Sequence, residues 1–142
     1  MAVLKKNQQQ RIFTPHMKEM TRLLNCSMQE LQRNKFEYLH HFCDTYQLTC
    51  VLKDARSLVY RNDENCFINL TGNSALAKGG TGDVLTGIIA GIYAQCKDTY
   101  RSACLGVYLH GMLGDYARKD KGKYSVCAGD LTEYLGEVLK QI

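Results

Sequence analysis

The stretch ALAKGGTGDVLTGIIAGI, residues 75–92, decides how the rest of the chain is interpreted. Gly79, Gly80 and Gly82 stand directly before Asp83, and apolar residues then recur at helical spacing. Because glycine has no Cβ, backbone N–H groups can converge ahead of such a helix. Together with the helix dipole, these N–H groups favour binding of an anion, typically a phosphate.

Asp83 is the only acidic residue of the stretch, and its charge repels phosphate. It suits a base that accepts a proton from a hydroxyl reacting near phosphorus. The alternative is that Asp83 only stabilises a first helical turn, after glycines that form a tight turn. Standard phosphate motifs do not decide between the two, because the stretch lacks GxxxxGK[ST] and Leu85 occupies the last glycine position of GxGxxG.

The composition is that of one globular domain, with 142 residues, 45% hydrophobic and 23% charged. The net charge of +4 is spread along the chain and there is no tryptophan, which argues against nucleic-acid binding. Seven cysteines without a CxxC pair predict reduced thiols rather than disulfides or a zinc site. With neither a signal peptide nor an apolar run of about 18 residues, we expect a cytoplasmic protein and no membrane partner.

Local patterns predict helices and a small number of strands. Thr14 with Pro15 is typical of a helix start, and Ser27 with Glu30 forms a capping box that opens a helix reaching Tyr46. Short strands are expected at residues 11–13 and 48–53, and a hairpin from 57–61 and 66–70.

Three helices are expected after the hairpin: one beyond the glycines, one over 103–117, and one opened by a capping box of Asp130 with Glu133. Gly87 and Gly91 lie one turn apart and predict close packing of another backbone. This is an α/β pattern, with fewer strands than so many helices normally flank.

Five segments in order resemble one known family: TPHMKEMTRLL, VLKDARSLVY, NLTGNSALAKGGTGDVLTGIIAGI, GVYLHGMLGDYA and AGDLTEYL. They are similar to the C-terminal half of the ADP/ATP-dependent NAD(P)H-hydrate dehydratases, the carbohydrate-kinase-like branch of the YjeF-related proteins. The resemblance implies a ribokinase-like fold, a three-layer α/β sandwich of which residues 1–142 form only the C-terminal half. The resemblance also implies that the N-terminal half of the family domain is not among these residues.

The reaction implied by the resemblance is repair of hydrated nicotinamide cofactors, NADHX and NADPHX. The terminal phosphate of ADP or ATP activates the hydroxyl on the damaged ring, elimination restores NADH or NADPH, and Mg²⁺ is held through phosphates and water. Two alternatives stay open: a non-catalytic adenine-nucleotide-binding or assembly fragment, and a small-alcohol kinase of the same superfamily.

The resemblance also implies roles for individual residues. Asp83 faces the substrate as the base, and His16 contacts the hydrated cofactor unless it only caps a helix. Lys53 lies near the phosphates and Gly82 donates its N–H to the nucleotide. The full nucleotide-binding set is Lys53, Asp54, Ala55, Arg56, Ser57, Gly79, Gly80, Thr81 and Gly82.

Other polar residues are expected to be structural. Asn73 holds a turn, His110 packs in a helix stripe, and His40 and His41 lie at the surface. No set of metal ligands is apparent in the sequence.

Two substitutions depart from the family pattern. Asp54 stands where the family usually has glycine, and an acid there repels phosphate. Lys78 stands where a small or polar residue is usual, and a cation there can help to hold phosphate.

Half of a sheet also exposes an apolar edge, which predicts self-association into a homo-oligomer.

Overall fold

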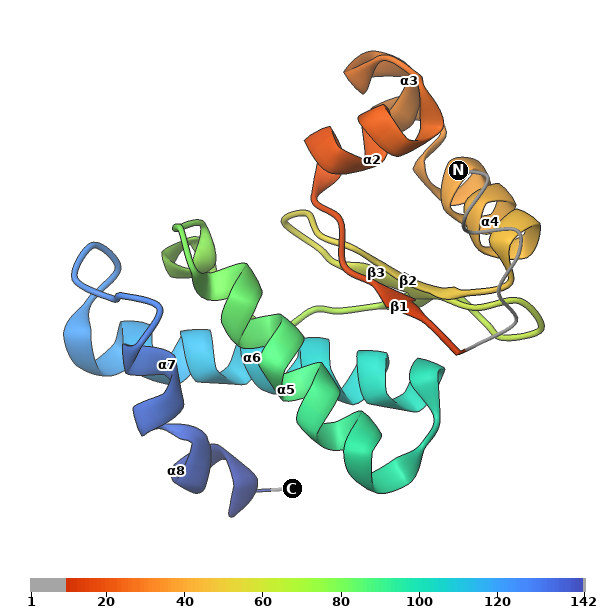
Figure 1. The fold of residues 1–142 in the computed structure, drawn as a ribbon. Coiled ribbons are helices and arrows are strands. Elements are labelled where there is room, and N and C mark those ends of the chain that lie inside the picture. The colour runs from red at the N-terminus through yellow and green to blue at the C-terminus, as the bar shows by residue number, and fades with distance from the viewer. Residues whose placement is uncertain (1–9, 142) are drawn as a thin grey trace. The chain divides into compact units, whose positions relative to one another are not determined.

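The structure is a computed structural model that describes residues 10–141 of the chain (Figure 1). It consists of two compact units, Met1–Ile68 and Asn69–Ile142. Each unit has its own cluster of buried apolar side chains.

The first unit is built on a four-stranded sheet in the order β1-β2-β3-β4. β1 is Ile12–Phe13, β2 is Thr49–Leu52, β3 is Leu58–Tyr60 and β4 is Phe67–Ile68. β1 and β2 are parallel, whereas β2, β3 and β4 pair antiparallel. The short first strand and the hairpin predicted from the sequence are therefore confirmed.

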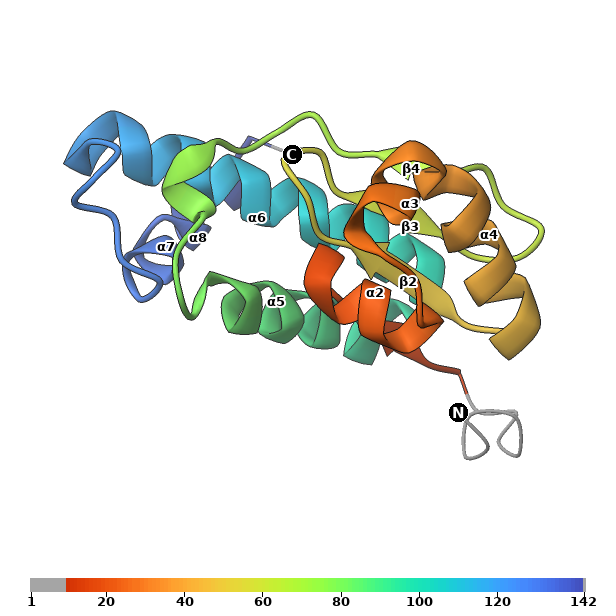
Figure 2. The ribbon, with the colours of Figure 1, turned by 90° about the horizontal axis from the view of Figure 1, so that it is seen from above.

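Three helices of the first unit cover the same face of this sheet (Figures 1 and 2). They are α2, Met17–Leu24, α3, Met28–Arg33, and α4, Lys35–Tyr46. The predicted Ser27–Glu30 capping box is present. The predicted single helix from Ser27 to Tyr46 is wrong, because the backbone of Asn34 leaves the helical region at φ −120° and ψ 36°.

The start of α2 also differs from the prediction, because its N-cap is His16 and not Thr14. His16 Nδ1 accepts a hydrogen bond from Glu19 N at 3.1 Å, and the Glu19 carboxylate accepts one from His16 N at 2.8 Å. The Pro15 carbonyl accepts a hydrogen bond from Lys53 N at 2.8 Å. Residue 15 thus continues the sheet pairing, and the helix can begin only after it.

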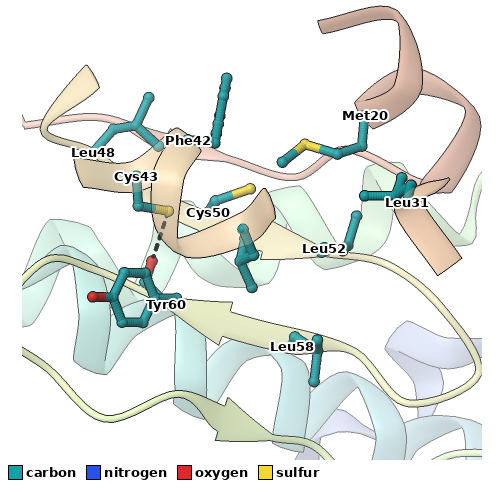
Figure 3. Packing of buried hydrophobic residues seen from close by; sticks show 10 residues of the cluster. Met20, Leu31, Phe42, Cys43, Leu48, Cys50, Leu52, Leu58 and Tyr60 are labelled. Carbon is teal, nitrogen blue, oxygen red and sulfur yellow. Dashed lines mark hydrogen bonds between the residues drawn. The ribbon is translucent and has the colours of Figure 1, made fainter. Parts of the chain in front are cut away.

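The core of the first unit lies between the helices and the sheet (Figure 3). Met20, Leu31 and Phe42 are fully buried, and the thiol of buried Cys43 donates to Tyr60 O at 3.4 Å. All seven cysteines lie in the described part of the chain and are free thiols. His40 is half-buried and stacks on Tyr60 with ring centroids 3.9 Å apart, so its predicted surface position is wrong, whereas His41 is exposed.

The second unit is helical. It contains the 3₁₀ turn η1, Ser74–Leu76, followed by α5, Thr81–Cys96, α6, Thr99–Lys121, α7, Asp130–Glu133, and α8, Leu135–Leu139. His110 is buried within α6, as predicted. Along residues 10–141 no helix has the length and hydropathy needed to cross a bilayer.

The close approach between α5 and α6 does not use the predicted glycines. A Cβ at Gly87 or Gly91 would meet nothing within 4 Å among the described residues. A Cβ at Gly106 of α6 would lie 2.4 Å from Ile89 Cγ1. The prediction is wrong because α5 turns Ile89 toward α6, which places the small residue of the contact on the partner helix.

The predicted capping box of Asp130 with Glu133 is wrong as well. Asp130 is the first residue of α7, after Gly129 at the N-cap. Its carboxylate accepts a hydrogen bond from Cys127 N at 2.6 Å and lies 2.7 Å from Lys121 Nζ. The same ammonium lies 2.8 Å from a Glu133 carboxylate oxygen, so both acids serve a contact to α6.

Candidate functional site

The glycine turn leads directly into α5, as predicted. Gly80 is the N-cap, with φ 86°, a left-handed conformation that glycine adopts without strain. Gly80 O accepts hydrogen bonds from Asp83 N at 3.1 Å and Val84 N at 3.2 Å. The amides of Gly79, Gly80, Thr81 and Gly82 donate to no described residue. They are donors that an anion at the helix N-terminus can use.

The Thr81 side chain fixes the shape of the turn. Its hydroxyl is bonded to Leu76 O at 2.7 Å and to Lys78 O at 2.9 Å, and the residue is buried. Because the hydroxyl has one hydrogen and it points into the turn, only the Thr81 amide remains for an anion.

Asp83 lies in the first turn of α5 and is exposed. Within the described chain, its carboxylate forms no hydrogen bond or ion pair. A carboxylate committed to neither a helix cap nor a cation can accept a proton from a bound group.

A polar network that the sequence analysis missed holds the segment before the turn on α6. Asp115 accepts hydrogen bonds from Gly72 N at 2.9 Å and Asn73 Nδ2 at 2.7 Å. Asn69, which is 6% exposed, donates to Val107 O at 3.1 Å. The Asn73 side chain accepts from Ala75 N at 2.9 Å, so its predicted role in holding the turn is confirmed. The available signal for Asp115 was an acid within the stretch of α6 between Arg101 and Arg118, which has no other charged residue apart from His110 if protonated.

In the first unit, the structure brings His16 and Lys53 together. The two residues form a parallel bridge that continues the pairing of β1 with β2. The segments that follow these strands, residues 14–16 and 53–57, therefore both leave the sheet at the carboxyl ends of the parallel strands. The carboxyl ends of parallel strands are where ligands bind in α/β sheets, so this edge is the candidate ligand-binding edge of the first unit.

Residues 53–57 are mostly accessible. Asp54, Ala55 and Arg56 are exposed, whereas Lys53 and Ser57 are half-buried. The Lys53 ammonium forms no hydrogen bond or ion pair within the described residues, which leaves its charge available to an anion.

The two residues that depart from the family pattern both have partners. Lys35 Nζ lies 2.5 Å from Asp54 Oδ2, and Ala55 N donates to Asp54 Oδ1 at 2.8 Å. Burial raises the pKa of Asp54, but the hydrogen bonds from Lys35 and Ala55 outweigh it and hold the pKa below its ordinary value. Lys78 Nζ donates to Tyr124 O at 2.7 Å and Val126 O at 2.5 Å.

Across the described residues, no three His, Cys, Asp or Glu side chains gather where they could hold a metal ion.

Comparison with known proteins shows which family shares this sequence. A family model described as NAD(P)H-hydrate dehydratase matches residues 2–137. The chain is 40% identical to the bifunctional NAD(P)H-hydrate repair enzyme Nnr of Moorella thermoacetica over 92% of its own length and 25% of that protein. It is 35% identical to the ADP-dependent (S)-NAD(P)H-hydrate dehydratase of Bacillus subtilis, over 92% of this chain and 47% of the relative.

Comparison with solved structures gives matches to the same family. The ADP/ATP-dependent NAD(P)H-hydrate dehydratase of Bacillus subtilis, co-crystallised with ATP and Mg²⁺, superposes with a TM-score of 0.87 at 34% identity, over 96% of this chain and 51% of that one. A ribokinase-like superfamily protein of Enterococcus faecalis gives a TM-score of 0.80 at 33% identity, over 92% of this chain and 44% of its own. The predicted ribokinase-like fold is thus confirmed, and the chain spans between a quarter and a half of the curated relatives described above.

Proposed function

The chain belongs to the NAD(P)H-hydrate dehydratase family, and from this we propose that it contributes to the ADP- or ATP-dependent dehydration of NADHX or NADPHX to NADH or NADPH. The observation that carries the proposal is the glycine turn. Amides without partners within the described chain stand at a helix N-terminus, and the unpaired Asp83 carboxylate follows directly.

The proposed roles follow from the chemistry of each group. The amides of residues 79–82 hold the negative charge of a nucleotide phosphate. Asp83 accepts the proton of the substrate hydroxyl as its oxygen attacks the terminal phosphorus and the shortened nucleotide leaves. The phosphate ester then leaves the ring as inorganic phosphate while the neighbouring ring carbon loses a proton to water, which restores the double bond. Mg²⁺ is bound through phosphates and water.

Residues of the first unit are assigned to the ligands as well. We propose that His16 contacts the hydrated cofactor and that residues 53–57 lie along the adenine nucleotide, with Lys53 near its phosphates. The parallel bridge between His16 and Lys53, at the carboxyl ends of their strands, supports these roles.

The experiment is a pair of measurements on Asp83→Asn. Titration calorimetry measures ADP affinity, and the return of NADH absorbance in a mixture of chain, ADP and NADHX measures turnover. We expect Asp83→Asn to keep ADP affinity and lose turnover by a factor of about 100 or more. Glu137→Gln is the matched control, because Glu137 is exposed and its side chain has no partner among the described residues. Equal turnover of Asp83→Asn and wild type would contradict the proposal.

A second candidate function is a non-catalytic adenine-nucleotide-binding or assembly fragment. The observations that favour it are Asp54 and Lys78, which depart from the family pattern at the segments assigned to the nucleotide. It predicts ADP binding without turnover in wild type and in Asp83→Asn alike.

We further propose that residues 1–142 belong to a single, partial ribokinase-like domain that acts in the cytoplasm and self-associates. The free thiols support a reducing compartment. The place of β1 at one end of the strand order supports association through a sheet edge. Light scattering coupled to gel filtration tests the oligomer, and a monomer at all concentrations would rule it out.

A further inference from the structure

The Lys78 side chain joins two segments of the second unit that are distant in sequence. Its ammonium donates to the backbone carbonyls of Tyr124 and Val126. Both acceptors lie in residues 122–129, between α6 and α7, which we call the α6–α7 loop. Lys78 itself stands directly before the glycine turn, so it ties that turn to the loop.

The loop and the turn also touch through small residues. A Cβ at Gly80 would lie 3.0 Å from Ala128 Cβ. The Lys78 carbonyl accepts the Thr81 hydroxyl at 2.9 Å, which couples Lys78 to the first residue of α5. The position of the α6–α7 loop therefore limits how the turn can lie.

The α6–α7 loop is a firm support because it is anchored apart from Lys78. Val126 is fully buried. Cys127 N donates to Asp130, and the same Asp130 carboxylate pairs with Lys121 at the end of α6. A contact to such a loop restrains the turn more than a contact to a loosely held segment would.

We propose that Lys78 is a positioning residue for the nucleotide phosphate. It fixes the turn that carries the amides of residues 79–82 by tying it to the α6–α7 loop, and it keeps a positive charge near that turn. The inference rests on the proposed function, in which this turn binds phosphate. Since two of the three ammonium hydrogens are used by carbonyls, Lys78 acts through the turn and not by enclosing the phosphate itself.

The test compares Lys78→Met, which keeps an unbranched side chain without the charge, with Lys78→Arg, which keeps the charge. Lys119→Met is the matched control, because Lys119 is exposed in the same unit and has no partner among the described residues. Titration calorimetry measures the affinities for ADP and for adenosine. Hydrogen exchange of the ligand-free chain follows the hydrogen-bonded amides of Asp83 and Val84 after the turn and of Ser125 and Cys127 in the α6–α7 loop, with α6 as the reference for an intact fold.

We expect Lys78→Met to weaken ADP binding about tenfold, equivalent to about 1.4 kcal/mol, and to leave adenosine binding unchanged. Exchange in both segments should become faster while α6 stays protected. Lys78→Arg should lose less affinity than Lys78→Met, and Lys119→Met should behave as wild type.

Several results would overturn the inference. Wild-type ADP affinity in Lys78→Met would show that the tie has no role in binding, and an equal loss for adenosine would show a general structural role. Weaker ADP binding with unchanged exchange would mean that Lys78 contacts the phosphate directly. If Lys78→Met does not fold, Lys78→Arg and Lys78→Gln replace it in the test. Exchange and ADP affinity equal to wild type in both of these variants would then overturn the inference. If the wild-type chain does not bind ADP, the proposed function itself is contradicted. That outcome is distinguishable from a failure of the Lys78 inference, which concerns differences between variants.

Discussion

The ammonium of Lys35 lies 2.5 Å from the carboxylate of Asp54, a residue 19 positions away in the segment assigned to the adenine nucleotide. This ion pair cancels the charge that would otherwise repel a nucleotide phosphate from residues 53–57. We therefore expect Lys35→Met to weaken ADP binding by a factor of about 3 to 10, because it leaves Asp54 unpaired. Calorimetric titration with ADP measures this. The double variant Lys35→Met with Asp54→Asn should recover wild-type affinity, and no recovery would show that Lys35 acts in another way.

Gly106 should tolerate no side chain. A Cβ there would overlap Ile89 of α5, so Gly106→Ala is expected to destabilise the chain by about 1–3 kcal/mol. Gly87→Ala and Gly91→Ala are the matched controls, because a Cβ at either site meets nothing within 4 Å. Each should raise stability by about 0.5–1 kcal/mol, since glycine is a weak helix former. Thermal unfolding followed by circular dichroism measures the stability of each variant. A loss of stability in the two controls would mean that another copy of the chain covers the face of α5 that carries Gly87 and Gly91.

Asp115 should stabilise the segment before the glycine turn. Asp115→Ala removes the acceptor for Gly72 N and Asn73 Nδ2, and we expect it to cost about 1 kcal/mol of unfolding free energy. It should also speed hydrogen exchange at Gly72. Urea denaturation and exchange of the ligand-free chain measure both effects. If Asp115→Ala and the control Glu137→Gln unfold at the same urea concentration, the network does not stabilise the unit.

Acid should weaken the link between α6 and α7. Hydrogen bonds from Lys121 and from Cys127 N lower the pKa of Asp130 below 3.8. The unfolded chain therefore binds a proton at a higher pH than the folded chain. The stabilisation by Asp130 is present above pH 3.8 and is lost as the pH falls through the lower folded value.

Urea melts from about pH 6 to about pH 3 test this, with Asp130→Asn as the comparison. The difference in unfolding free energy between wild type and variant should shrink at the acidic end of the range. A constant difference would show that the Asp130 charge contributes nothing.

Features whose partners lie within a few residues could be predicted from the sequence. The Ser27–Glu30 capping box is of this kind, and so is the start of α5 after the left-handed Gly80. The start of α2 could not be predicted, since it depends on the hydrogen bond from Lys53 N to Pro15 O, across the sheet.

The candidate site likewise has parts that are set by local sequence and parts that are set by partners distant in the chain. The position of Asp83 in the first turn of α5, directly after the glycines, follows from local sequence. The partners of Asp54 and Lys78 are 19 and 46 or more positions away, so no local pattern could show that both side chains already have hydrogen-bond partners. Gly106 was missed because only the partner helix determines which glycine lies at a contact.

The cap of α2 decides which tautomer His16 adopts. Its Nδ1 accepts the Glu19 amide, so in the neutral ring the hydrogen must reside on Nε2. Its Nε2 lies 3.3 Å from a Glu19 carboxylate oxygen, so an acceptor on a ligand must compete with that carboxylate for the hydrogen, and neither ring nitrogen offers a free lone pair. In this arrangement His16 is suited to recognising an oxygen acceptor through Nε2, while its Nδ1 lone pair serves the helix cap.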